Sequence, residues 1–171
     1  MKTTVYLADL RHNFGGVLST DCMPLGIGFM KAVMDHELPA DEVESRLFAY
    51  PDALLKAMEE APPDVLMVSN YVWNEALSHA FVRRAKRANP KVLTVMGGPN
   101  IAVEPERQVA YFESHPELDV YLCGEGDFIA SQLVRAYIDC GRSIAALGER
   151  DLTSCIYRRP SGEVVRTETL G

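Results

Sequence analysis

Four short segments hold most of the side chains and glycines that could recognise a ligand. They are residues 10–23, 69–74, 97–100 and 124–126. Glycine, amide and hydroxyl groups predominate in these segments, and Tyr71 and Trp73 add aromatic surface. Few of the side chains are charged. Such a combination suits a large, neutral ligand with many amides better than it suits a polyanion.

The chain lacks the motifs of several common enzymes and binding proteins. The dinucleotide motif G-x-G-x-x-G is incomplete at Gly26 and Gly28 and again at Gly124 and Gly126, because each pair lacks the third glycine. Ser69 stands where a phosphorelay receiver domain carries its phospho-accepting aspartate, and the first segment has too few hydroxyls for a flavin phosphate. The motifs G-x-S-x-G and H-E-x-x-H and the P-loop are absent.

Composition and residue spacing exclude further classes of site and partner. None of the four cysteines forms a C-x-x-C pair, so a cytoplasmic location is the simplest expectation. The histidines show no ligand spacing, and His36, His79 and His115 are expected on the surface. The formal net charge of −7 argues against nucleic acid as a partner. No apolar run is long enough to cross a membrane.

Strands and helices that alternate along the chain must position the four segments. Short apolar runs predict five strands, at residues 3–8, 43–48, 64–68, 91–96 and 119–123. Periodic apolar stripes predict helices at residues 24–36, 51–60, 74–89, 104–112 and 127–140. Right-handed crossovers then give a parallel sheet with helices on both faces. The second strand alternates as an edge strand should, which favours the order 2-1-3-4-5 of a flavodoxin-like (Rossmann-like) α/β domain.

The C-terminal part of the chain predicts a different element. Residues 155–159 and 163–166 flank a Pro-Ser-Gly turn and indicate a β-hairpin appended to the α/β domain. We therefore expect a ligand-binding domain over residues 1–148 and a hairpin linker over residues 149–171. In the α/β domain the four segments should converge at the carboxyl edge of the sheet, where open α/β sheets bind their ligands.

Four motifs occur in order along the chain, at the ends of predicted strands. They are Met23-Pro24-Leu25-Gly26-Ile27-Gly28, Ser69-Asn70-Tyr71-Val72-Trp73-Asn74, Gly97-Gly98-Pro99-Asn100 and Gly124-Glu125-Gly126. Together they resemble the N-terminal cobalamin (vitamin B12)-binding domain of the cobalamin-dependent radical SAM enzymes. The resemblance covers essentially the whole chain, and the C-terminal hairpin resembles the link that precedes the catalytic domain in those enzymes.

The resemblance implies a site for cobalamin. The corrin would lie across the carboxyl edge of the sheet, and its nucleotide tail would enter a slot beside the strand that ends at Met96. Gly97 and Gly98 would leave space for the tail, and the Ser69 hydroxyl could hydrogen-bond the displaced benzimidazole. The implied cofactor-binding residues are His12, Gly15, Ser69, Asn70, Tyr71, Trp73, Gly97, Gly98, Pro99, Asn100, Gly124, Glu125 and Gly126.

Some of these residues also have structural alternatives. Tyr71 and Trp73 either line the corrin or pack at the start of the next helix. Glu125 either accepts hydrogen bonds from corrin amides or stabilises the N-terminus of the last helix. Asn74 could cap the helix that it precedes.

The first segment departs from the family pattern. Members in which a histidine ligates cobalt carry D-x-H-x-x-G, whereas this chain has D-x-x-H-x-x-G from Asp9 to Gly15. The extra residue prevents Asp9 from holding the imidazole of His12 in the usual way. The chain in this respect resembles members that bind cobalamin without a histidine ligand. We therefore expect His12 near the corrin or in solvent, and ligation of cobalt by His12 remains the less favoured alternative.

The sequence has no C-x-x-x-C-x-x-C motif for a [4Fe–4S] cluster. The resemblance therefore implies that cluster and S-adenosylmethionine belong to a downstream radical SAM domain of the same polypeptide. This chain would position cobalamin for a methyltransferase-like reaction without catalysing it. One alternative is a stand-alone flavodoxin-like ligand-binding or regulatory module without cobalamin. Another is a small enzyme that acts on a nucleotide or sugar.

Overall fold

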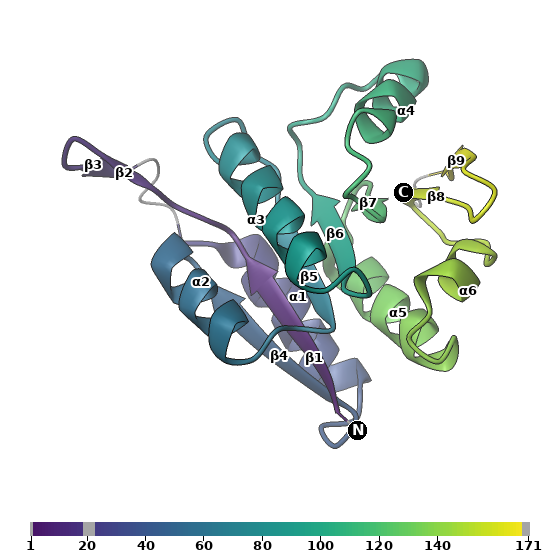
Figure 1. Ribbon diagram of the computed structural model, residues 1–171, viewed down its shortest axis with the longest axis horizontal. Helices are drawn as coiled ribbons and strands as arrows, with labels where there is room; N and C mark the ends of the chain where they lie inside the picture. Colours follow the sequence, from purple (N-terminus) through teal and green to yellow (C-terminus); the bar gives the residue numbers. More distant parts are fainter. Residues whose placement is uncertain (1, 19–22, 169–171) are drawn as a thin grey trace.

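The computed structural model describes residues 2–18 and 23–168 and has one large sheet at its centre (Figure 1). Its seven strands are β1 (Thr3–Ala8), β4 (Val43–Phe48), β5 (Val65–Ser69), β6 (Leu93–Gly97), β7 (Val120–Leu122), β8 (Cys155–Arg158) and β9 (Val164–Arg166). Their order across the sheet is β4-β1-β5-β6-β7-β8-β9. The first five of these run parallel, whereas β8 and β9 are antiparallel to their neighbours.

Helices cover both faces of the sheet. They are α1 (Leu25–Glu37), α2 (Pro51–Glu60), α3 (Glu75–Ala88), α4 (Pro105–Glu113), α5 (Gly126–Asp139) and the short α6 (Ile144–Gly148). Side chains alternate along a strand, so Val5 and Leu7 of β1 enter a core with α1 and α5. Tyr6 and Ala8 enter the opposite core with α2, α3 and α4. This mostly parallel α/β arrangement confirms the predicted fold class.

The sheet is larger than predicted. A count of five strands was wrong, because the predicted hairpin forms as β8 and β9 and extends the main sheet. β8 pairs with β7 from Val120↔Tyr157 to Leu122↔Cys155. The β8 residues Cys155 to Tyr157 are buried, so the hairpin covers backbone groups that the short β7 would otherwise expose. The strand order therefore differs from the predicted one by the two strands after β7.

The first segment contains an unexpected pair of short strands, β2 (Asn13–Phe14) and β3 (Val17–Leu18). They pair antiparallel and project away from the main sheet (Figure 1). Residues 19–22 of this segment lie outside the described residues. In the part of the chain that the structure describes, no helix combines the length and the apolar character needed to cross a membrane.

Candidate functional site

A cavity of about 140 Å³ lies where β1, β5, β6 and β7 end and α1 and α5 begin. Several predicted site residues line it, together with an apolar wall. The polar and glycine side consists of Asp9, Gly26, Ser69, Tyr71, Gly97, Gly98, Gly124, Gly126 and Asp127, and the wall includes Ile27, Met30, Met67, Met96 and Leu122. Parallel strands bring these positions to one edge, and Ser69 and Gly97 are direct partners in the sheet.

Ser69 belongs to a hydrogen-bonded group at the mouth of this cavity. Its hydroxyl donates to Oδ1 of Asp9 over 2.7 Å and accepts from Nδ2 of Asn74 over 2.8 Å. Asn74 Nδ2 also donates to Asp9 Oδ1 over 3.1 Å. Asn74 occupies the N-cap position of α3, but its side chain makes no capping hydrogen bond there. The expected cap is instead the third member of the group with Asp9 and Ser69.

Asn70 holds the loop after β6 in place through buried hydrogen bonds. It is fully buried, and its Nδ2 donates to the Asn100 carbonyl over 2.9 Å. The Asn100 amide group donates back to Asn70 Oδ1 over 3.2 Å. Tyr121 supports the same loop by donating its hydroxyl to the Gly98 carbonyl over 2.8 Å. The amide of Asn70 thus faces the protein interior, and Asn70 does not line the cavity.

Gly98 is required by the contact between two loops. Its φ is +124°, and a Cβ there would lie 2.6 Å from the carbonyl oxygen of Asn70. At Gly97 a Cβ would meet Cβ of Leu122 at 3.4 Å, which is a tight but ordinary contact. Pro99 and Asn100 line a separate hollow of about 600 Å³ with Glu75 and Tyr111. The loop therefore has one side towards the cavity and one towards this hollow.

The aromatic pair of the second segment is stacked. The rings of Tyr71 and Trp73 lie 4.5 Å apart between centroids with an interplanar angle of 5°. Tyr71 lines the cavity, and burial together with the nearby Asp9 charge raises the pKa of its phenol. Trp73 is 36% exposed and Val72 is 79% exposed. This pair gives the cavity mouth a flat apolar border.

The remaining predicted residues are placed differently. His12 is exposed and directly precedes β2, and Gly15 occupies the β2–β3 turn at a φ of +59°. Both lie on the projecting segment, and neither lines the cavity. Glu125 is exposed and precedes α5 without a side-chain capping bond. Burial raises the pKa of the neighbouring Asp127 carboxyl, and the charge of Glu125 raises it further. No group of metal-ligating side chains gathers among the residues described.

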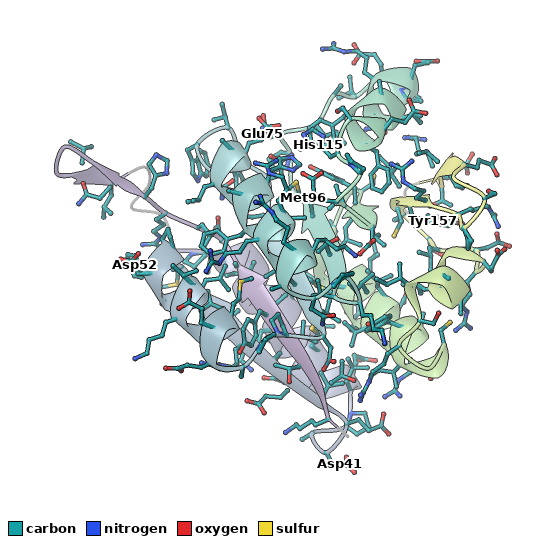
Figure 2. All side chains as sticks on the ribbon, viewed as in Figure 1. Asp41, Asp52, Glu75, Met96, His115 and Tyr157 are labelled. Carbon is teal, nitrogen blue, oxygen red and sulfur yellow. The ribbon has the colours of Figure 1, made fainter. Side chains whose placement is uncertain are left out.

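A second polar cluster lies between α3 and α4, and sequence reasoning missed it. His79 is 3% exposed, so the prediction of a surface histidine was wrong. Its Nε2 lies 2.7 Å from the Tyr111 hydroxyl, and its ring stacks on His115 at 3.9 Å. His115 and Glu75, labelled in Figure 2, both lie beside Tyr111, whose ring centroid is 4.5 Å from that of His115. Burial and then the charge of His115 lower the pKa of His79, which is held neutral.

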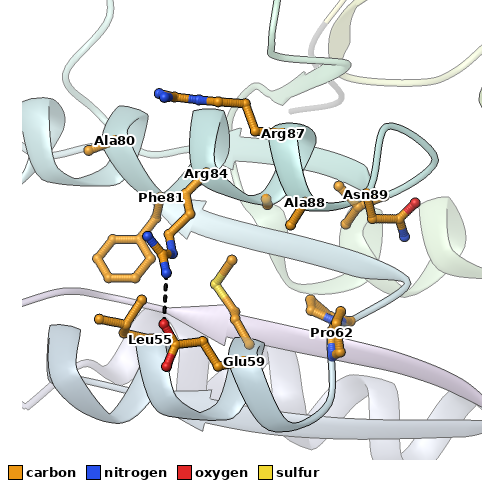
Figure 3. Close-up of a pocket in the computed structure, with 13 residues that line it drawn as sticks. Leu55, Glu59, Pro62, Ala80, Phe81, Arg84, Arg87, Ala88 and Asn89 are labelled. Carbon is orange, nitrogen blue, oxygen red and sulfur yellow. Dashed lines mark hydrogen bonds and ion pairs between the residues drawn. The ribbon is translucent and has the colours of Figure 1, made fainter.

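A larger cavity lies elsewhere, between α2 and α3 (Figure 3). Its volume is about 740 Å³, and it contains none of the predicted site residues. Leu55 and Phe81 form part of its apolar floor, and an ion pair between Arg84 and Glu59 at 2.7 Å crosses it. Three of the four predicted segments, residues 69–74, 97–100 and 124–126, contribute to the smaller cavity, which is therefore the candidate site.

Known enzymes are similar in sequence to parts of this chain. TokK, a cobalamin-dependent radical SAM methyltransferase of Streptomyces tokunonensis, is 40% identical over 72 residues, which are 42% of this chain and 10% of TokK. The 2-(S-pantetheinyl)-carbapenam-3-carboxylate methyltransferase of Streptantibioticus cattleyicolor is 31% identical over 124 residues, 71% of this chain and 18% of that enzyme. The chain thus spans less than a fifth of these relatives.

Solved structures share the fold over nearly the full chain. OxsB, a cobalamin-dependent S-adenosylmethionine radical enzyme with aqua-cobalamin and S-adenosylmethionine bound, aligns with a TM-score of 0.68 at 17% identity over 99% of this chain and 22% of OxsB. A cobalamin-binding protein of Desulfitobacterium hafniense aligns with a TM-score of 0.50 at 11% identity over 80% of this chain and 59% of that protein. The model of the B12 binding domain matches residues 14–134, and this chain therefore belongs to the B12-binding domain family.

Proposed function

We propose that this chain binds cobalamin at the carboxyl edge of its sheet and presents it to a radical SAM domain of the same polypeptide, outside this chain. The observation that carries the proposal is the cavity at the ends of β1, β5, β6 and β7 in a member of the B12-binding family. When bound, cobalamin supplies methyl-carrier or radical chemistry, while the protein supplies binding and orientation.

The size and lining of the cavity fit part of this cofactor. A cavity of about 150 Å³ with apolar walls is large enough to hold one benzene ring. The cavity measures about 140 Å³ and has three methionines in its wall, so it offers a slot for a flat aromatic group. The corrin itself would remain outside, across the stacked Tyr71 and Trp73. The fused rings of the nucleotide base would need a small outward movement of a wall residue such as Met30.

The finer placement of the cofactor is also part of the proposal. Gly97, Gly124 and Gly126 would border the tail, while Glu125 would accept hydrogen bonds from corrin amides. The D-x-x-H spacing and the position of His12 on the projecting segment support binding without a histidine ligand to cobalt. Asn70, Pro99, Asn100 and Gly98 would act by shaping the loop beside the tail.

The whole protein would be a cobalamin-dependent radical SAM methyltransferase. Two curated relatives are named as methyltransferases, and one of them as a cobalamin-dependent radical SAM enzyme. The [4Fe–4S] cluster and S-adenosylmethionine would be bound by the downstream domain, in a cytoplasmic protein. Residues 149–171, whose β8–β9 hairpin extends the main sheet, would lead to that domain.

A variant at Gly26 tests the location of the site. Gly26 lies in the first turn of α1 and lines the cavity, and a Cβ there would have no described atom within 4 Å. We expect Gly26→Leu to fold normally, because leucine favours a helix over glycine by about 0.8 kcal/mol. Its side chain would fill the slot and weaken hydroxocobalamin binding by about tenfold or more, which corresponds to roughly 1.4 kcal/mol. Visible absorbance retained after desalting, followed by titration, measures this effect.

Gly28 provides the matched control. It lies in the same helix and has the same free space around a Cβ, but it does not line the cavity. Gly28→Leu should therefore bind hydroxocobalamin as the unchanged chain does. A colourless unchanged chain after desalting would contradict cobalamin binding, and equal binding by both variants would contradict the location.

A further inference from the structure

One backbone N–H determines which atoms donate and which accept in the hydrogen-bonded group of Asp9, Ser69 and Asn74. The backbone N–H of Tyr71 lies 2.9 Å from Oδ1 of Asn74, and an N–H can only donate, so that atom is the amide oxygen. The other terminal atom of Asn74 is then Nδ2, and its two hydrogens point to Ser69 Oγ at 2.8 Å and to Asp9 Oδ1 at 3.1 Å.

The acceptor of the Ser69 hydroxyl proton is consequently determined as well. A hydroxyl has one hydrogen to donate and two lone pairs that accept. Ser69 Oγ accepts from Asn74, so its hydrogen goes to Asp9 Oδ1, 2.7 Å away, which is the usual distance for a hydroxyl that donates to a carboxylate. One lone pair remains. Ser69 and Asp9 both line the cavity, and Ser69 therefore offers an acceptor to a ligand there.

We infer that Asp9 is a positioning residue that makes Ser69 a hydrogen-bond acceptor, and that Ser69 recognises an N–H or O–H donor of the corrinoid. This inference rests on the proposed function of the same cavity. An amide N–H of a corrin side chain or a hydroxyl of the nucleotide tail has the required chemistry. An unprotonated nitrogen of the displaced base lacks this chemistry, because it can only accept a hydrogen bond. The hydrogen bond expected from Ser69 to the benzimidazole is therefore replaced by one that Ser69 accepts from the ligand.

Ser69 and Asp9 variants test this direction. Ser69→Ala should weaken cobalamin binding roughly two- to tenfold, the usual range for one neutral hydrogen bond. Asp9→Ala should also weaken it, since the freed hydroxyl no longer turns its lone pair to the ligand. Asp9→Asn should restore binding, because an amide oxygen at the same place still accepts from Ser69 and Asn74. The double variant Ser69→Ala/Asp9→Ala should bind no more weakly than Ser69→Ala, because the two residues act through one contact.

Three corrinoids identify the donor without relying on Asp9. They are cobalamin, cobinamide, which lacks the nucleotide, and cobalamin methylated at the base nitrogen that would face the protein. A Ser69→Ala effect that persists with cobinamide identifies a corrin amide. An effect that disappears with cobinamide but persists with methylated cobalamin identifies a tail hydroxyl. Either result supports the inference, and these measurements remain possible if Asp9→Ala does not fold.

Other outcomes would overturn the inference. An Asp9→Ala chain that folds and binds cobalamin more tightly would mean that the freed Ser69 proton reaches an acceptor on the ligand. The same conclusion would follow from a Ser69→Ala effect that disappears with both cobinamide and methylated cobalamin. Unchanged binding in Ser69→Ala, or in a folded Asp9→Ala chain, would also overturn it. If the unchanged chain bound none of the three corrinoids, the proposed function itself would fail, which is a different result from any of these.

Discussion

Gly98 illustrates how a single residue can serve both the fold and the site. Its backbone has a φ of +124°, and Cβ would lie 2.6 Å from the Asn70 carbonyl oxygen. We expect Gly98→Ala to lower the free energy of unfolding by about 3 kcal/mol, because strain at positive φ and a clash with backbone add together. Chemical denaturation of the chain without ligand measures this loss.

Gly162 is the control for Gly98, since it has a φ of +92° with no atom within 4 Å of a Cβ. Gly162→Ala should cost about 1 kcal/mol, the part that comes from the backbone conformation. Equal losses of unfolding free energy in the two variants would show that the close contact with Asn70 does not add to the cost. The glycine pair was identifiable from the sequence, but its contact with Asn70 was not. That contact depends on the packing of two loops that are 28 residues apart, as the positions 70 and 98 show.

His79 should make stability depend on pH. Burial lowers the pKa of His79 in the folded chain below the value of about 6.5 in the unfolded chain. The folded state therefore resists a proton that the unfolded state accepts, and stability is highest above about pH 6.5. It falls as the pH decreases from there towards the lowered pKa, by at most about 1.4 kcal/mol per pH unit. The groups that face His79 are Glu75, Arg83, Tyr111, His115 and Glu117.

Denaturation between pH 7.5 and 5.5 tests this dependence. His79→Gln should be less stable at neutral pH but should lose less stability on acidification than the unchanged chain. Identical acid slopes for His79→Gln and the unchanged chain would refute a neutral, buried His79. The burial of His79 was not predictable from the sequence, because a polar side chain on α3 was expected to face solvent. In the fold, Tyr111 and His115 of a distant segment enclose it.

At the scale of elements, the β8–β9 hairpin is part of the core. Ile156 is fully buried and pairs with Tyr121 of β7, whereas Val164 on β9 is half-buried. We expect Ile156→Ala to cost about 2–5 kcal/mol, as for other buried isoleucines. Val164→Ala should cost clearly less, because less of its surface leaves water on folding. If thermal or chemical unfolding gave equal losses, the hairpin would be peripheral to the domain.

The bounds of the helices and strands were easier to predict from the sequence than the pairing of the strands. Apolar periodicity places all five of the long helices and the five parallel strands close to their observed bounds. The hairpin was also identifiable from its Pro-Ser-Gly turn. Its addition to β7 was not, because the same local sequence could form a hairpin beside the sheet or within it. Which occurs depends on the unpaired edge of β7, a property of the assembled sheet.

For the whole molecule, the location of the candidate site was easier to predict from the sequence than its hydrogen bonding. The α/β alternation predicts four segments at one edge of the sheet, and three of them line the cavity there, whereas the described part of residues 10–23 does not. The direction of the Ser69 hydrogen bond could not be predicted, because it depends on Asp9, 60 residues away, and on the backbone of Tyr71. The motif comparison treats Asp9 as a partner of a histidine, whereas the fold makes it a partner of a serine.

The pairing of β8 with β7 also affects how the chain is made. Residues emerge during synthesis from the N-terminus, so the parallel strands are complete before Cys155–Arg158 appears. Until then, β7 presents an open edge that can pair with a second nascent chain. The β8–β9 hairpin closes that edge, and the risk of aggregation should therefore fall sharply only when the hairpin has been synthesised.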